Sequence, residues 1–164
     1  MSSKTPKQTP KQTPKPTYLT VIKNTQLISI DLIVKNKDNK YLLGLRNNKP
    51  AKNFWFVPGG RICKLEDFAD AIKRISLDEI GVELNNGKSL GVYRHLYKDN
   101  FDNNDFETEY IVFPYLFTVN DIEIKTDNQH SIVKWYSEKE ILDDPFIHIN
   151  VKKYFYDTPD NKIL

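Results

Sequence analysis

Apolar runs rich in β-branched and aromatic residues, separated by polar turns, predict a chain built mainly of β-strands. We expect strands at residues 26–34, 41–45, 54–57, 90–97, 109–119 and 132–136. The polar turn at residues 37–40 joins the first two strands as a hairpin. Pro114 interrupts the strand at 109–119 and predicts a sheet edge or a bulge there, because proline cannot donate a ladder hydrogen bond.

One amphipathic helix is predicted from about residue 66 to a stop at Gly81. Phe68, Ile72 and Ile75 recur at helical spacing and define an apolar face, on which Glu79 also falls. A carboxylate on such a face needs a compensating cation, and the last turn of a helix favours positive charge. For this acidic turn, a bound Mg²⁺ or Mn²⁺ and an ion pair with Arg74 are both open interpretations.

Two further helices are predicted after the last strand. Ser137 and Glu140 form a capping box for a helix that continues to about Asp143. Asn150 is expected to cap a final helix that includes Tyr154. Strands on both sides of a central helix, without regular alternation of strand and helix, predict an α+β fold or a mixed-sheet sandwich.

The first 17 residues differ in composition from the rest of the chain. They hold a degenerate four-residue repeat, four of the nine prolines and almost no apolar side chains. We therefore expect a disordered tail at residues 1–17 and one domain at residues 18–164. A docking arm and Thr-Pro phosphorylation sites are possible uses of the tail, and a solubilising leader is the simpler interpretation.

The formal charge of +2 depends on that tail, which contains four lysines and no acid. Residues 18–164 hold 20 basic and 22 acidic residues, a balance that does not favour duplex nucleic acid as a partner. The single cysteine, Cys63, permits no internal disulfide and fits a reducing compartment. Apolar runs are too short to span a membrane and the N-terminus lacks a signal-peptide pattern, so we expect a cytoplasmic protein.

Several residues suggest chemistry before any family is considered. Asp31 interrupts an apolar strand, so it must line a cavity or be paired, for example with a neighbouring loop. Gly59 and Gly60 are expected to adopt positive φ and let the backbone approach a ligand, with Arg61 directly after them. His95 shares a strand face with two tyrosines, an arrangement more typical of a structural histidine than of a catalytic one.

Residues 60–82 resemble the Nudix box, G-x5-E-x7-R-E-U-x-E-E-x-G-U, where U is a large aliphatic residue. The matching residues are Gly60, Glu66, Arg74, Glu79, Gly81 and Val82. The chain departs from the box at Ile75, Ser76 and Asp78. These departures, and segments such as YLLGLRNNKPAKNFWFVPGGR and GVYRHLYKDNF, are similar to the GDP-mannose mannosyl hydrolase branch of the family over roughly residues 18–157.

This resemblance implies the Nudix fold, an α/β/α sandwich around a mixed β-sheet, and a homodimer. It also implies one Mg²⁺, with Mn²⁺ as a substitute, held by the Gly59 carbonyl, Glu79 and Gln129. His130 is the general base implied by the resemblance. The positions around the substrate are Arg46, Arg61 and Tyr110 for the diphosphate, and Asp31 and His95 for the sugar.

The reaction implied by the resemblance is hydrolysis of GDP-mannose or a close GDP-hexose at the anomeric carbon, with inversion. Asp78 partly restores the acidic pair of the box, so a second metal and attack at phosphorus, giving GMP and a sugar phosphate, is the alternative. A non-catalytic nucleotide-sugar sensor is a third hypothesis, although Glu79, Gln129 and His130 together are more than a binding protein needs. A capped-RNA substrate is a remote fourth, because the basic charge lies in the tail.

Overall fold

The computed structural model describes residues 13–100, 102, 105–120, 122–124 and 130–164, with only the backbone described at residues 130 and 131. The strands are β1 (Leu27–Lys35), β2 (Tyr41–Arg46), β3 (Trp55–Phe56), β4 (Gly59–Arg61), β5 (Lys88–Ser89), β6 (Tyr93–Tyr97), β7 (Thr108–Thr118) and β8 (His130–Tyr136). The helices are α1 (Lys15–Asn24), α2 (Phe68–Ile80), α3 (Glu138–Asp143), α4 (Ile149–Lys152) and the 3-10 helix η1 (Lys153–Phe155).

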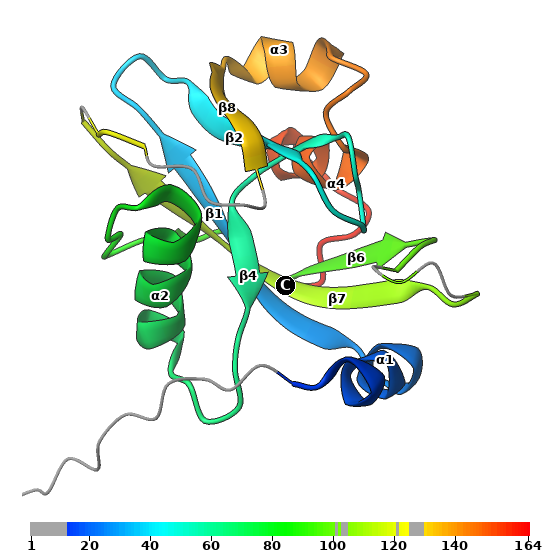
Figure 1. The fold of residues 1–164 in the computed structure, drawn as a ribbon. Coiled ribbons are helices and arrows are strands. Elements are labelled where there is room, and N and C mark those ends of the chain that lie inside the picture. Colours follow the sequence, from blue (N-terminus) through cyan, green and yellow to red (C-terminus); the bar gives the residue numbers. More distant parts are fainter. Residues whose placement is uncertain (1–12, 101, 103–104, 121, 125–129) are drawn as a thin grey trace, which may run out of the picture.

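Strand β1 lies at the centre of the sheet (Figure 1). On one side it pairs in parallel with β7 along its whole length, and on the other it pairs antiparallel with β4 and with the start of β2. Beyond these, β2 pairs with β3 and β8, and β7 pairs with β5 and β6. The remaining pairings are antiparallel, so the predicted mixed sheet is confirmed.

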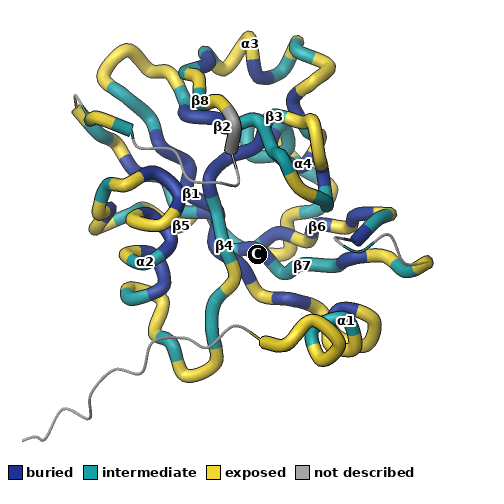
Figure 2. Tube along the Cα trace, in the orientation of Figure 1, coloured by how far each residue is buried: buried dark blue, intermediate teal, exposed yellow. Residues whose placement is uncertain are grey.

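Helices cover both faces of the sheet, which confirms the predicted α+β sandwich. Ile30, Leu32 and Val34 of β1 point to one face, where they form a core with α2. Ile33 points to the opposite face, where its core includes Ile141 of α3 and further residues near α4. Figure 2 shows the consequence for β1, whose central part is buried, whereas much of α1 and α3 remains exposed.

The central helix α2 has the C-terminal end that its sequence predicts and, apart from the exposed Phe68 at its start, the predicted apolar face. Gly81 adopts a left-handed conformation (φ 70°) and its N–H donates to the Leu77 carbonyl, which ends the helix. Ile75 is 1% exposed and Glu79 is 5% exposed, so the carboxylate does lie on the buried face. The last turn contains no basic residue. The acidic end of α2 is therefore a real feature of the fold.

The glycines before Arg61 serve a different purpose from the one expected. Neither Gly59 nor Gly60 has positive φ, so that prediction is wrong, and both belong to strand β4. A Cβ atom on Gly60 would lie 3.0 Å from Cγ1 of Ile75. The absence of a side chain at Gly60 therefore lets α2 pack directly against β4, and close lateral packing rather than backbone conformation explains the glycine.

Pro114 lies inside the sheet, so the predictions of an edge or a bulge are wrong. The parallel register of β7 with β1 runs without a break through the pair Asp31 and Pro114. On its other side, β7 pairs with β6 up to Val112 and with β5 from Tyr115. Pro114 thus lies where β7 changes partner, and its carbonyl accepts a hydrogen bond from Leu90 N–H at 3.0 Å.

The terminal elements also differ in part from expectation. Helix α1 was not predicted; it begins at Lys15, three residues before the expected domain boundary, and residues 1–12 lie outside the described part. The capping box of Ser137 and Glu140 is confirmed. The final helix is capped by His148, whose Nδ1 accepts from the Asn150 N–H, and not by Asn150 itself. None of the helices in the described ranges has the length and hydropathy that crossing a membrane requires.

Candidate active site

A cavity of about 280 Å³ opens on the face of the sheet opposite to α2. Strand alternation places Ser29 and Asp31 of β1 on this face, and the register brings Gly59 and Arg61 of β4 beside them. The lining residues are Tyr18, Ile22, Ser29, Asp31, Arg46, Lys49, Pro50, Phe56, Val57, Gly59, Gly60, Arg61, His95, Tyr97, Thr108, Tyr110 and Val112. Seven residues that the sequence singled out therefore meet in one cavity: Asp31, Arg46, Gly59, Gly60, Arg61, His95 and Tyr110.

Asp31 is buried, with 6% of its surface exposed, and both of its carboxylate oxygens are closely surrounded. Its Oδ2 accepts a hydrogen bond from the Tyr154 hydroxyl at 2.6 Å. A Cβ atom on Gly59 would lie 2.7 Å from Oδ1, so a glycine is required at that position. Asp31 is thus both paired and part of a cavity wall, and its partner belongs to η1 rather than to a neighbouring loop.

Burial determines the protonation of Asp31 and His95. Desolvation raises the pKa of Asp31 to about 7, against the smaller opposing effects of the Tyr154 hydrogen bond and the Arg46 charge. His95 is 1% exposed, and burial, with smaller effects of His148 and Lys153, lowers its pKa to about 3. His95 is therefore a neutral imidazole at neutral pH, and its role in the cavity is that of a hydrogen-bonding group.

Cationic side chains line the same cavity. Among the described residues, Arg46, Lys49 and Arg61 contribute positive charge, against the carboxylate of Asp31. The Arg46 guanidinium lies 5.7 Å from the centroid of the Phe56 ring, and its Nε has no hydrogen-bond partner in the described part of the protein. The Arg61 guanidinium lies 4.0 Å from the centroid of the Tyr18 ring on α1. This lining favours an anionic ligand.

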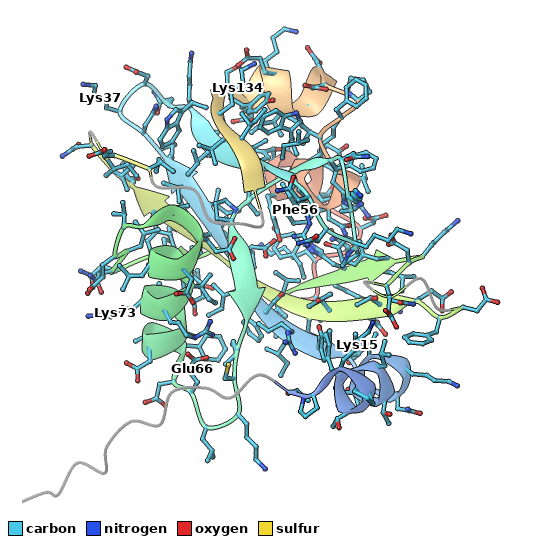
Figure 3. All side chains as sticks on the ribbon, in the orientation of Figure 1. Lys15, Lys37, Phe56, Glu66, Lys73 and Lys134 are labelled. Atoms are coloured by element: carbon cyan, nitrogen blue, oxygen red, sulfur yellow. The ribbon has the colours of Figure 1, made fainter. Side chains whose placement is uncertain are left out.

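Aromatic side chains complete the wall. Phe56, labelled in Figure 3, lies between β6 and the start of α4, where it contacts the rings of His95 and His148. Tyr97 contacts both Phe56 and Tyr110. Burial raises the pKa of the Tyr110 phenol, with smaller effects that include a hydrogen bond with Tyr18, so its hydroxyl keeps its proton.

The described residues expected to hold a metal come from strand β4 and helix α2. Gly59 of β4 is paired with Asp31 of β1. In the next pair along the ladder, the Leu32 N–H donates to the Pro58 carbonyl, and at the other end of β4 the Ile62 N–H donates to the Ile28 carbonyl. In an antiparallel ladder the pair one residue away from a hydrogen-bonded pair is not itself hydrogen-bonded, so the Gly59 carbonyl points away from β1 and is available as a ligand. Glu79 supplies a buried carboxylate from α2.

These oxygen donors fit a hard divalent cation. No group of three His, Cys, Asp or Glu side chains capable of holding a metal occurs within the described residues, which is compatible with a ligand set that contains one carboxylate and a backbone carbonyl. Gln129 lies outside the described residues. His130 is described by its backbone, which lies in β8 opposite Arg46.

The other acids of the box are engaged elsewhere. Glu66 accepts two hydrogen bonds from Arg74, Nε to Oε1 at 2.7 Å and Nη2 to Oε2 at 2.8 Å, and a third from the Cys63 N–H. Asp78 is 64% exposed at its side chain and lies 3.8 Å from Arg74, the ion pair that the sequence analysis considered. Arg74 is therefore primarily the partner of Glu66.

Sequence reasoning missed four residues of the site: Tyr18, Lys49, Tyr97 and Tyr154. Strand alternation placed Tyr97 on the face of His95, which is the signal that could have included it. Tyr154 was placed in a terminal helix without a role, and it is 123 residues from Asp31 in the sequence. No local pattern in the sequence indicates that contact.

Comparison with known proteins is consistent with this architecture. The profile of the NUDIX domain matches residues 25–157. The low-salt glycan biosynthesis protein Agl8 of Haloferax volcanii is 32% identical over 137 residues, which are 82% of this chain and 83% of that protein.

Two solved structures are similar in fold. The MutT protein from Methanosarcina mazei Go1 has a TM-score of 0.68 at 20% identity and covers 79% of this chain and 90% of its own. The NUDIX domain of Shewanella oneidensis NrtR, solved with ADP ribose, has a TM-score of 0.61 at 19% identity and covers 87% of this chain and 97% of its own. At these identities the two structures establish the fold alone.

The buried carboxylate of Asp31 predicts a pH-dependent gain of stability in the variant Asp31→Asn. The folded protein holds the Asp31 proton up to about pH 7, whereas the unfolded chain releases it near pH 4, so this residue lowers the free energy of unfolding as pH rises between those values. Relative to wild type, the variant should gain on the order of 2–3 kcal/mol between pH 5 and pH 8.

Urea unfolding of both proteins at the two pH values, in the presence of a chelator, measures this gain. The matched control is Asp78→Asn, the same substitution at a largely exposed position. A difference between Asp31→Asn and wild type that stays constant from pH 5 to pH 8 would contradict the raised pKa.

Proposed function

This chain belongs to the NUDIX family, and from that premise we propose that it hydrolyses GDP-mannose or a close GDP-hexose at the anomeric carbon. The observation that carries the proposal is the composition of the cavity. Cationic side chains suited to a diphosphate and a buried polar cluster suited to a sugar lie in the same wall. At about 280 Å³ the cavity would enclose part of such a ligand, since sites for whole ligands are usually larger.

The relative from Haloferax volcanii supports a sugar-linked substrate. Its name assigns it to glycan biosynthesis, a process in which sugars are carried as activated nucleotide derivatives. The sequence similarity of the box and of the segments around it to GDP-mannose mannosyl hydrolases supports the same substrate class. The departures from the box at Ile75 and Ser76 resemble those of the GDP-mannose mannosyl hydrolases.

The diphosphate would be bound by charge and by a neutral donor. Arg46 and Arg61 are the cations expected there, and Arg46 has an Nε–H that is still available. Tyr110 would donate its hydroxyl. Lys49, which lines the same cavity, is a third cation that the sequence analysis did not include. Their charges stabilise the negative charge that gathers on the departing GDP.

The sugar would be oriented by hydrogen-bond acceptors, in contrast to the cations and the donor that bind the diphosphate. The carboxylate of Asp31 can accept hydrogen bonds from sugar hydroxyls, and neutral His95 offers one ring nitrogen as an acceptor. Tight contacts with Gly59 and Tyr154 keep the Asp31 side chain in place. Fixed acceptors of this kind hold the anomeric carbon in one orientation, which lowers the entropy cost of reaching the transition state.

Members of the family generally use divalent metal cations. In this chain the Gly59 carbonyl, Glu79 and Gln129 would hold Mg²⁺ or Mn²⁺. When bound, the cation would neutralise charge on the diphosphate leaving group.

The reaction transfers a sugar from GDP to water. His130 would accept a proton from the attacking water as its oxygen forms a bond with C1 of the sugar. The bond between C1 and the diphosphate oxygen breaks, and its electron pair leaves with GDP. Attack from the face opposite to GDP gives the free sugar with inverted configuration.

The position of Asp78 is relevant to the alternative, attack at phosphorus. That side chain is largely exposed and pairs with Arg74, whereas Glu79 next to it is buried. This placement supports attack at carbon over a second metal site. A nucleotide-sugar sensor remains a separate hypothesis that turnover measurements distinguish.

Product analysis in ¹⁸O-water tests the proposal. Incubation of GDP-mannose with the protein and Mg²⁺ should give GDP and mannose, with the label in the sugar. GMP and mannose phosphate, with the label on a phosphoryl group, would overturn attack at carbon. Tight binding without turnover would identify a sensor, and neither binding nor turnover would exclude this substrate.

The variant His130→Gln tests the assigned base. Because a general base acts in the transition state, kcat should fall by about 10²–10⁴-fold while KM changes little. Steady-state kinetics at saturating Mg²⁺ give both constants. Unchanged turnover would remove His130 from the mechanism.

The variants Glu79→Gln and Glu66→Gln separate metal binding from helix packing within one motif. Loss of the Glu79 carboxylate should weaken Mn²⁺ binding by at least about 10-fold. Removing a residue that only hydrogen-bonds to a metal ligand typically lowers metal affinity by about 10- to 100-fold, and loss of a direct ligand should cost at least as much. Glu66 is bonded to Arg74, so Glu66→Gln should leave Mn²⁺ affinity near that of wild type. Mn²⁺ titration by electron paramagnetic resonance measures both, and equal affinities for the two variants would remove Glu79 from the ligand set.

A further inference from the structure

Three side chains from distant parts of the chain form a hydrogen-bonded row, and two of them, Asp31 and His95, line the cavity. The Tyr154 hydroxyl, from η1, donates to Asp31 Oδ2 on β1 at 2.6 Å. The same hydroxyl lies 3.2 Å from Nε2 of His95 on β6. Asp31 and His95 are the groups assigned to the sugar, whereas Tyr154 has had no function so far. Because the Tyr154 hydroxyl lies between Asp31 and His95, we expect Tyr154 to act by orienting these two side chains.

When Asp31 is an ionised carboxylate, the row has one arrangement of protons that satisfies its members. A phenol has a single O–H, and the bond to Asp31 takes it. The hydroxyl oxygen can then only accept from His95, which requires a hydrogen on Nε2. A neutral imidazole with its hydrogen on Nε2 carries none on Nδ1, so Nδ1 becomes an acceptor.

The surroundings hold each partner in the state that this arrangement needs. Burial, and then the nearby charge of Asp31, raises the pKa of the Tyr154 phenol well above its ordinary value, so the hydroxyl stays a donor. Burial keeps His95 neutral, with a lowered pKa. Oδ2 of Asp31 is held by Tyr154, and Oδ1 lies in the space that a side chain at position 59 would occupy. The row therefore has little freedom to rearrange.

We propose that Tyr154 is a positioning residue, which fixes the Asp31 carboxylate and holds His95 as its Nε2–H tautomer. His95 Nδ1 is then an acceptor for a hydroxyl group of the substrate, and Asp31 is a second, oriented acceptor. The identity of that hydroxyl as part of a sugar rests on the proposed function. The assignment of the tautomer does not, because it follows from the contacts of the row alone.

The variant Tyr154→Phe removes the hydroxyl and keeps the ring. The ring contact with Tyr93, at 5.0 Å between centroids, should survive and maintain the packing of η1. Tyr93→Phe is the matched control, because Tyr93 is a neighbouring buried tyrosine on the same strand as His95. Thermal unfolding of both variants shows whether each remains folded.

Nitrogen-15 NMR of the imidazole rings at pH 8, where Asp31 is a carboxylate, measures the tautomer directly, without any substrate. The chain has three histidines, and the variant His95→Gln identifies the signals of His95. In wild type and in Tyr93→Phe, His95 should carry its hydrogen on Nε2. In Tyr154→Phe that preference should be lost. A hydrogen on Nδ1 in wild type, or an Nε2–H preference that persists in Tyr154→Phe, would overturn the proposal.

Kinetics test the consequence for the substrate. With GDP-mannose, Tyr154→Phe should lower kcat/KM by about 10- to 100-fold, the range expected for a hydrogen bond to a charged group, and Tyr93→Phe should change it little. Equal losses in the two variants would indicate a packing effect and contradict the positioning role. If the wild-type protein does not turn over GDP-mannose, the proposed function fails, and the NMR result still decides the role of Tyr154.

Discussion

The central position of β1 is the constraint on which the rest of the structure depends. Because β1 has partners on both sides, its backbone hydrogen bonds are satisfied within the sheet and its side chains alternate between two covered faces. Ile30 and Leu32 serve the core beneath α2, and Asp31 between them faces the cavity. A carboxylate at that depth is costly, and it is retained with a close hydrogen bond from Tyr154 and with its pKa raised by burial.

Local sequence patterns were sufficient for the elements that such patterns encode. Six strands, the face and end of α2 and the capping box of Ser137 follow from spacing over a few residues, and the structure confirms them. The strand expected at residues 90–97 is shorter, since β6 begins at Tyr93, and the short strands β4 and β5 were not predicted. Family resemblance brought Arg46, Arg61 and Tyr110 into the site, and the structure places them around one cavity. The roles assigned to them stay predictions, as do those of Gln129 and His130.

What the sequence could not provide were facts about neighbours in space. Gly59 and Gly60 were assigned to backbone conformation, yet the reason for each is a side chain of another element that occupies its space. Pro114 predicted an edge or a bulge because proline lacks an N–H donor. It lies instead where β7 changes partner, which no local pattern reveals. Tyr154 reaches Asp31 across 123 residues of sequence. In each case the determining contact is tertiary, and the local rule was applied without knowledge of it.

Strand β4 connects the box helix and the cavity, which lie on opposite faces of the sheet. Gly60 packs against Ile75 of α2, and Gly59 packs against Asp31 in the cavity wall. Ile75 occupies the position where the box resembled here has a glutamate, and it is 1% exposed. That position therefore joins α2 to β4 instead of supplying charge. Glu66 is bonded to Arg74, so Glu79 is the buried acid of the box near the end of α2. This arrangement supports a metal site with few carboxylates. Selectivity for the substrate would then depend on the residues of the cavity, on the face of the sheet opposite to α2.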